Sequence, residues 1–157
     1  MYGTLAEAET YFTDELSGTW GDYTDGQKTV ALEEATRQID RLQFKGEKYQ
    51  WSPTQTLAFP RVFNFNCQTI YFDEDLTNGG VVVPTDVEHA TYLQAKHLLD
   101  VAIGGDSTGQ ALRAGITSRS ILSTSESYDK TLSPVDLKTG IHRDAMQLLE
   151  KYLLVGW

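Results

Sequence analysis

The sequence lacks several features on which whole classes of protein depend. Cys67 is the single cysteine among 157 residues, which excludes an internal disulfide framework and a zinc site built from cysteines. No run of residues approaches the roughly 18 apolar residues that a membrane-spanning helix needs. Met1-Tyr2-Gly3-Thr4 carries neither the basic nor the apolar region of a signal peptide. We therefore expect the chain to be made and kept in a reducing cytoplasm.

Motifs of catalysis, metal binding and nucleotide binding are missing or out of context. The chain contains neither G-x-x-x-x-G-K-[ST] nor G-x-G-x-x-G. Gly105-Asp106-Ser107-Thr108-Gly109 matches the G-x-S-x-G nucleophile elbow, but a predicted helix precedes it where the elbow needs a strand. Residues 73–79 resemble a calcium loop, but Pro84 stands where a bidentate Glu is required. His89 and His97 are too far apart along one predicted helix to share a metal without other ligands. We expect a non-enzymatic protein with no cofactor and no metal.

Positive charge is scarce in the chain and concentrated in one region. The sequence has 13 Lys and Arg against 22 Asp and Glu, a formal net charge of −9, whereas residues 36–61 hold five basic and two acidic residues. Within this region, residues 44–61 interleave cations with aromatic rings, and we call them the basic–aromatic segment. Such a segment can stack bases and hold phosphates. Alternatively, its rings cap the helical core while its cations are solvated or contact a protein, and the absence of a basic excess overall favours this interpretation.

Hydrophobic periodicity and capping signals predict a mainly α protein, a small bundle of about four helices. We expect a capping box from Thr4 to Glu7 to open the first helix, which ends at Ser17-Gly18. The other expected helices run from Thr24 to Gly46 with a Glu33–Arg37 pair, from a capping box at Thr85 and Glu88 to Gly104-Gly105, and from Ile141 to Leu154.

Two segments interrupt the helices. Thr69–Phe72 and Val81–Val83 flank Asn78-Gly79-Gly80, which predicts a β-hairpin in a β-rich insert over about 62–83. The Ser- and Thr-rich residues 111–130 are expected to form an extended arm whose strands pair with another chain. The whole chain, residues 1–157, is thus expected to be one domain with a helical core over about 4–46, 84–104 and 141–154.

The order of short motifs along the chain resembles a known family. The motifs are Thr-x-x-Glu-Ala-x-x-Tyr-Phe over 4–12, Lys-x-x-Ala-Leu-x-x-Ala-Thr-x-x-Ile-Asp-x-Leu-x-Phe-x-Gly over 28–46, Leu-Ala-Phe-Pro-Arg over 57–61, and Val-Pro at 83–84 before an Ala- and Leu-rich helix. This order is similar to that of the head–tail connector proteins (adaptor or head completion proteins) of long-tailed bacteriophages. Some members of the same group are described as DnaT-like single-stranded-DNA-binding domains. The resemblance is closest over residues 4–103.

The resemblance implies a structural virion protein that assembles with itself into a ring, often a dodecamer, beneath the portal protein. Such a ring would extend the channel for genomic double-stranded DNA, which passes without specific binding, and would dock the stopper or tail-completion protein. The expected location is the head–tail interface of the virion, after synthesis in the host cytoplasm. The expected subunit or portal contacts are Arg37, Arg41, Lys45, Arg61, Ile116, Ser118, Arg119, Ser120, Leu154 and Trp157.

The alternative function is a single-stranded-DNA-binding module. Its contacts would come from the basic–aromatic segment, namely Phe44, Lys45, Lys48, Trp51, Phe59 and Arg61.

Overall fold

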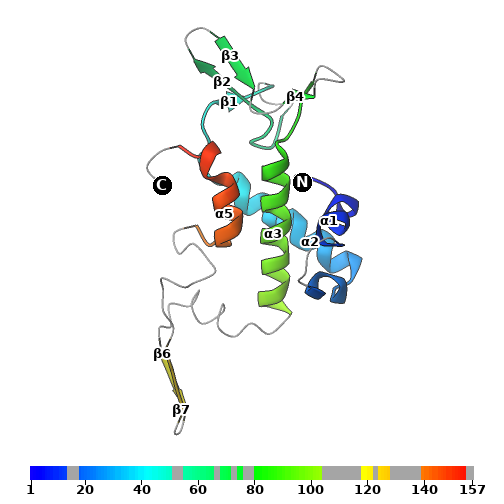
Figure 1. Ribbon diagram of the computed structural model, residues 1–157, viewed down its shortest axis with the longest axis vertical. Helices are drawn as coiled ribbons and strands as arrows, with labels where there is room; N and C mark the ends of the chain where they lie inside the picture. The colour runs from blue at the N-terminus through cyan, green and yellow to red at the C-terminus, as the bar shows by residue number, and fades with distance from the viewer. Residues whose placement is uncertain are drawn as a thin grey trace.

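The computed structural model describes residues 1–13, 18–50, 55–65, 68–71, 74–75, 80–103, 118–121, 124–127 and 139–154. The helices are α1 (Leu5–Thr13), η1 (Gly18–Asp22), α2 (Asp25–Asp40), α3 (Thr85–Ala102), α5 (Arg143–Leu149) and η3 (Glu150–Tyr152). The strands are β1 (Glu47–Lys48), β2 (Arg61–Phe65), β3 (Gln68–Tyr71), β4 (Glu74–Asp75), β5 (Gly80–Val81), β6 (Ser118–Ile121) and β7 (Thr124–Ser127). The helices form one group, with β1–β3 at one end and β6–β7 at the other (Figure 1). The expected helical bundle with a hairpin insert is confirmed.

Helices α1 and α2 begin at capping boxes, as the sequence predicts. At α1, the Thr4 N–H donates to Glu7 Oε2 at 2.7 Å and the Glu7 N–H donates to Thr4 Oγ1 at 3.3 Å. The start of α2 shows the same reciprocal pair. The capping box predicted for α3 is wrong, because Pro84 takes the N-cap position and has no side-chain group that accepts a hydrogen bond. Thr85 is therefore already inside the helix.

Two helices end earlier than the sequence predicts, for one shared reason. Helix α2 ends at Asp40 rather than Gly46, and the last helix ends before Leu153. Phe44 and Leu153 form an antiparallel bridge, flanked by backbone hydrogen bonds of 2.8 and 3.0 Å. Peptide groups that pair between these two segments are not available to continue either helix.

The β-rich insert is paired differently from the prediction. Strand β2 pairs antiparallel with β3, with Phe63 opposite Ile70, and β1 pairs with the other edge of β2. Strands β4 and β5 form a separate two-stranded pair. The predicted pairing of Thr69–Phe72 with Val81–Val83 is therefore wrong. Two residues separate β2 from β3 in the sequence, so their local pairing closes a shorter loop at a lower entropic cost.

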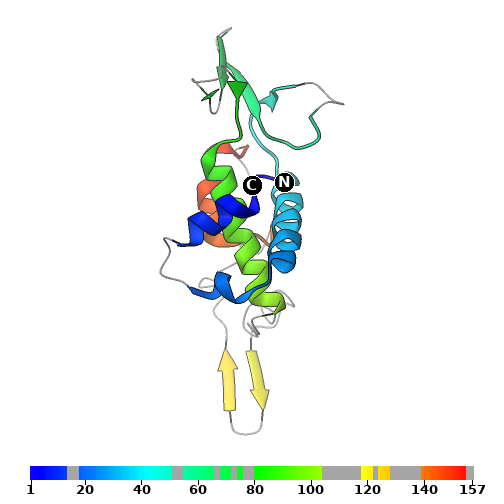
Figure 2. The ribbon, with the colours of Figure 1, turned by 90° about the vertical axis from the view of Figure 1, so that its right-hand side faces the viewer.

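Helix α3 lies between α2 and α5 and contributes to both halves of the core (Figure 2). One hydrophobic cluster joins α3 to α5, the end of α2 and the segment before β2, and includes Ile39, Phe44, Phe59, Val87, Ile141 and Leu149. The other joins α3 to α1, η1 and α2, and includes Phe12, Trp20, Leu32, Tyr92 and Leu99. Among the described residues, no helix is long and apolar enough to cross a membrane.

Tyr2, which precedes α1, belongs to the core. Tyr2 is fully buried, and its backbone N–H donates to Thr36 Oγ1 at 3.2 Å. Gly3 has a φ of 73°, and a Cβ at this position would lie 2.1 Å from Tyr92 Oη. Both the positive φ and the close approach of the Tyr92 ring require glycine here. The chain is thereby fixed against α2 and α3 before the first helix begins.

Candidate functional site: the basic–aromatic segment

The guanidinium of Arg61 is bonded to backbone carbonyls within the basic–aromatic segment. Nε donates to Lys45 O at 2.8 Å, and Nη2 donates to Phe44 O at 3.2 Å and to Gly46 O. Nη1 donates to Ala58 O at 3.4 Å. Burial lowers the pKa of this guanidinium, which nevertheless stays charged. Arg61 thus links the residues after α2 to those before β2. Four of the five N–H donors of its guanidinium are therefore used within the segment, and the predicted contact of Arg61 with a phosphate or a second subunit stays a prediction.

The two lysines of the segment also bond to backbone carbonyls. Lys45 Nζ donates to Lys151 O at 3.1 Å, which adds a bond beside the Phe44–Leu153 bridge. Lys48 Nζ donates to Thr56 O at 3.0 Å and approaches Gln55 O at 3.4 Å. Both cations therefore stabilise the path of the chain between α2 and β2. Lysine donors remain more accessible than those of Arg61, since the Lys45 bond is at the surface.

The described aromatic residues proposed to stack bases are core residues. Phe59 is 2% exposed, and its ring centroid lies 4.7 Å from that of Phe44 and 5.6 Å from that of Tyr152. Phe44 is 5% exposed. A base cannot stack on rings that are covered on both faces, so neither phenylalanine serves the alternative function as predicted. Trp51 lies outside the described residues.

A buried polar network holds the segment against α2. Asp40 Oδ1 accepts hydrogen bonds from Tyr2 Oη at 2.5 Å and from the Ala58 N–H at 2.6 Å. The Tyr2 hydroxyl in turn accepts the Phe59 N–H at 3.2 Å. Burial, together with the Asp40 carboxylate, raises the pKa of Tyr2. The chain start, the end of α2 and the turn before β2 are therefore joined by bonds in which each buried donor has an acceptor.

Arg37 in α2 and Arg41 directly after it lie on the surface. Arg37 Nε and Nη2 donate to Glu34 Oε2 at 3.0 and 2.8 Å, so the predicted i,i+4 pair with Glu33 is replaced by an i,i+3 pair. The hydrogen bond from Arg37 lowers the pKa of Glu34. Arg41 is also exposed, and its backbone N–H caps the C-terminus of α2. Both arginine side chains are placed where another molecule can reach them, and an exposed ion pair such as Arg37–Glu34 contributes little stability.

The remaining predicted contacts lie in β6, at the C-terminal end, or outside the described residues. Ser118, Arg119 and Ser120 stand opposite Ser127, Glu126 and Ser125 in the β6–β7 ladder. Leu154 is 45% exposed. Outside the described residues lie Ile116, Trp157, the Gly105–Gly109 motif and most of the loop over 73–79. Among the described residues, no group of three or more His, Cys, Asp and Glu side chains could hold a metal ion.

Two histidines meet at the contact between α3 and α5. The ring centroids of His97 and His142 are 5.2 Å apart. The His142 backbone N–H donates to Gln94 Oε1 at 2.7 Å, and Gln94 Nε2 donates to Gln38 Oε1 at 2.7 Å. A line of amides thus connects α5, α3 and α2 beside the two rings.

This arrangement predicts a pH dependence of stability. Burial lowers the pKa of His142 below 6.5, Lys96 lowers it further, and Asp144 and Asp100 oppose the shift. A folded-state pKa below the unfolded one gives stability that is fully present above the unfolded value of about 6.5 and is lost as the pH falls from there through the folded-state pKa. We expect His142→Gln to flatten the decrease in unfolding free energy between about pH 7 and 5, measured by urea unfolding.

The matched control for this change is His89→Gln, at a histidine that packs on Tyr11 rather than on α5. This change removes a histidine without altering the contact between α3 and α5, so comparison with it shows how much of the effect is specific to His142. An unaltered slope in His142→Gln would show that the pH dependence arises from another group.

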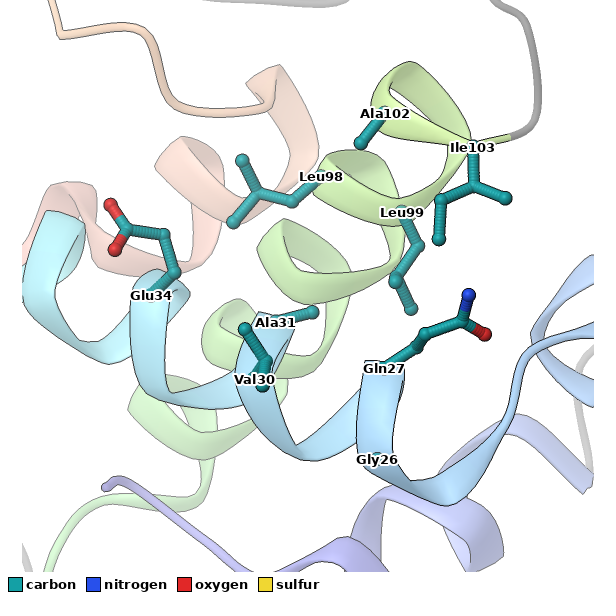
Figure 3. A pocket seen from close by; sticks show the side chains of 9 residues that line it. All are labelled: Gly26, Gln27, Val30, Ala31, Glu34, Leu98, Leu99, Ala102 and Ile103. Carbon is teal, nitrogen blue, oxygen red and sulfur yellow. The ribbon is translucent and has the colours of Figure 1, made fainter.

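Sequence reasoning missed an apolar groove between α2 and α3 (Figure 3). We call it the α2–α3 groove; its volume is about 510 Å³, and its apolar walls are Val30, Ala31, Leu98, Leu99, Ala102 and Ile103. Val30 is 64% exposed and Ile103 is 50% exposed. Val30 is the one sign of this groove in the sequence. It is an apolar residue next to the core-facing stripe of α2, and it makes the apolar face of this helix wider than the part that α3 covers.

The described residues define a small, mainly helical domain with short strand insertions. A family model described as "Putative DnaT-like ssDNA binding protein" matches residues 1–153. The chain belongs to this family. No curated protein and no solved structure matches the chain.

Proposed function

We propose that this protein is a head–tail adaptor of a bacteriophage virion, a non-enzymatic subunit that acts through its shape and its interfaces. In this role it assembles as a ring beneath the portal protein, extends the DNA channel and docks the stopper or tail-completion protein. The motif order over residues 4–103 motivates the proposal. The observation that carries it is the use of the basic–aromatic segment as scaffold, with Phe44 and Phe59 buried and Arg61 bonded to carbonyls.

The charge of the chain supports this role. A net charge of −9 repels phosphate, which suits a channel through which DNA slides without binding. Within the described residues, the cations of the basic–aromatic segment donate to the chain's own carbonyls. These bonds engage donors that a phosphate site would need, which supports the adaptor role over nucleic-acid binding.

The β6–β7 hairpin supports assembly with other chains. It is a two-stranded sheet that projects beyond the helices (Figures 1 and 2). Isolated two-stranded hairpins are marginally stable, and their outer edges offer unpaired backbone groups to another strand. A neighbouring subunit, or another component of the head–tail interface, would complete such a sheet.

The adaptor role is tested with portal-bearing, DNA-filled capsids. We expect the purified protein to co-sediment with these capsids and not with capsids that lack the portal. Equal recovery with both kinds of capsid, or no recovery with either, would refute the proposal.

The second candidate, single-stranded DNA binding, is favoured by the description of the family to which the chain belongs. Of its six predicted contacts, Lys45 and Lys48 remain the most accessible described side chains. Fluorescence anisotropy with labelled oligonucleotides at low and moderate salt separates the two functions. Micromolar binding that weakens steeply with salt, and weakens further in Lys48→Gln, would establish the second candidate. The adaptor proposal expects no binding even at low salt.

A further inference from the structure

Helices α3 and α5 lie side by side (Figure 1), and their contact brings two ionisable rings together. The ring centroids of His97 and His142 are 5.2 Å apart, His97 is 7% exposed, and the Nδ1 atom of His142 is buried. Two like charges this close repel each other far more strongly in a buried contact than in water. The charge of histidine changes between about pH 5 and 8. The contact therefore accommodates two neutral rings better than two charged rings.

The charged groups around the two rings leave a second positive charge poorly compensated. Asp144 Oδ2 lies 3.8 Å from His142 Nδ1, beyond hydrogen-bond distance, and its side chain is 64% exposed to solvent, which weakens the attraction. On α3, Asp100 is already paired with Lys96 at 3.4 Å, and Lys96 adds positive charge near His142. Helix α2 approaches through the neutral amide of Gln38. Burial accordingly lowers the pKa of His142 in spite of the two carboxylates.

Helix α5 depends on this contact more than the other helices do. It runs over only seven residues, Arg143–Leu149, and a helix of this length is not stable in water without tertiary contacts. Its buried residues Ala145 and Leu149 belong to the cluster that joins α3 and α5 to Phe44 and Phe59. Helices α1 and η1 and most of α2 pack on α3 through the other cluster. Separation of α5 from α3 therefore leaves that second cluster in place.

Helix α5 leads through η3 to the residues that cover part of the basic–aromatic segment. Residues 43–45 pair with residues 152–154 through backbone hydrogen bonds of 2.8 and 3.0 Å. The Tyr152 ring packs edge-on against Phe59, with 5.6 Å between the centroids. If α5 leaves α3, residues 43–45 lose these partners and Phe59 loses part of its cover.

We propose that His97 and His142 form a pH-sensitive switch for the C-terminal part of the fold. As the pH falls below about 6.5, protonation of both rings moves α5 and η3 away from α3, while α1, η1 and α2 stay packed on α3. The open state binds protons more tightly than the closed state, so acid favours it. The switch makes exposure of the basic–aromatic segment depend on pH. It acts within one chain, and it goes beyond the adaptor function without depending on it.

Backbone hydrogen exchange of the full-length chain, followed by NMR, tests the switch. The amides of Met146, Lys45 and Leu154 report on α5 and on its pairing with the basic–aromatic segment, because each donates within this part of the fold. The amides of Leu32 and Ala35 in α2 report on unfolding of the whole domain. We expect the first three to exchange through an opening with a smaller urea dependence than that of α2. After correction for the intrinsic pH dependence of exchange, the equilibrium constant of this opening should rise about tenfold or more between about pH 7.5 and 5.5.

Glutamine substitutions remove the titrating rings and keep polar side chains of similar size. In the double variant His97→Gln, His142→Gln, the equilibrium constant of the α5 opening should change by less than about twofold over the same pH range. His97→Gln alone should show a smaller increase than wild type, because one charge of the pair is missing. The matched control is His89→Gln, at a histidine of α3 that packs on Tyr11 of α1, and it should retain the wild-type increase in the α5 opening.

Several results would overturn the inference. They are exchange of Met146 and Leu154 with the same urea dependence as α2, an opening that acid does not favour, and a full increase in the double variant or in His97→Gln. NMR titration of the wild-type rings makes the test independent of how the variants fold. The resonances of both rings should shift over the pH range in which the opening becomes easier. Titration of both rings without any change in the opening would equally contradict the switch.

Discussion

Phe59→Ala should lower the free energy of unfolding by about 3–5 kcal/mol, as expected for a large aromatic side chain removed from a core. The Phe59 ring is 2% exposed and is surrounded by the rings of Tyr2, Phe44 and Tyr152. These three residues come from the chain start, the segment after α2 and the end of η3. A cavity at Phe59 therefore loosens three segments together. Urea unfolding followed by far-UV circular dichroism measures the effect.

The control is Tyr49→Ala, in the same segment, because Tyr49 is 42% exposed. We expect a loss below about 1 kcal/mol, as for most surface substitutions. A base-stacking role predicts the opposite pattern for Phe59→Ala, namely preserved stability with a loss of affinity for oligonucleotides. A stability loss below about 1 kcal/mol for Phe59→Ala would contradict the packing described here.

Local signals in the sequence predicted the helices and two of their beginnings. The capping bond between Thr4 and Glu7 joins residues three positions apart, so residue types alone reveal it. The ends of the helices depend on contacts that no local pattern contains. Lys45 and Lys151 are joined across 106 positions, beside the bridge that ends α2. The hydrophobic periodicity predicted that α2 runs to Gly46. Periodicity does not show that the backbone of Phe44 pairs with Leu153 instead of continuing the helix.

Composition alone located the basic–aromatic segment in the sequence. It did not predict the contacts that the segment makes in the structure. The basic and aromatic residues of 44–61 stand out in the sequence, and in the structure Arg61 bonds to the carbonyls of two of them, Phe44 and Lys45. Their partners are backbone carbonyls, which every residue carries and which leave no signature in residue type. The burial of Phe59 likewise follows from the network of Asp40 and Tyr2, and nothing in the sequence near Tyr2 predicted its place in the core. Charge and aromatic content alone are therefore compatible with both a ligand site and a scaffold.

Arg61→Met should lower the free energy of unfolding by about 2–4 kcal/mol, because it removes charge-assisted hydrogen bonds and leaves partly buried carbonyls without donors. Methionine keeps much of the apolar stem, so the lost bonds dominate the effect. Arg61→Lys should recover only part of the loss, since one ammonium cannot reproduce a planar fork that donates to Phe44, Lys45 and Ala58. Thermal and urea unfolding of the purified variants measure both changes.

Arg41→Met is the matched control for Arg61, because Arg41 is exposed at the end of α2. Its unfolding free energy should stay within about 0.5 kcal/mol of wild type. If Arg61 were instead a subunit contact, Arg61→Met would fold with wild-type stability and fail only in assembly. If Arg61 stabilises the fold, Arg61→Met lowers the free energy of unfolding, and any loss of assembly is a consequence of that lower stability. Wild-type stability of Arg61→Met would therefore contradict the scaffold role. It would support Arg61 as an interface residue and the basic–aromatic segment as a binding surface.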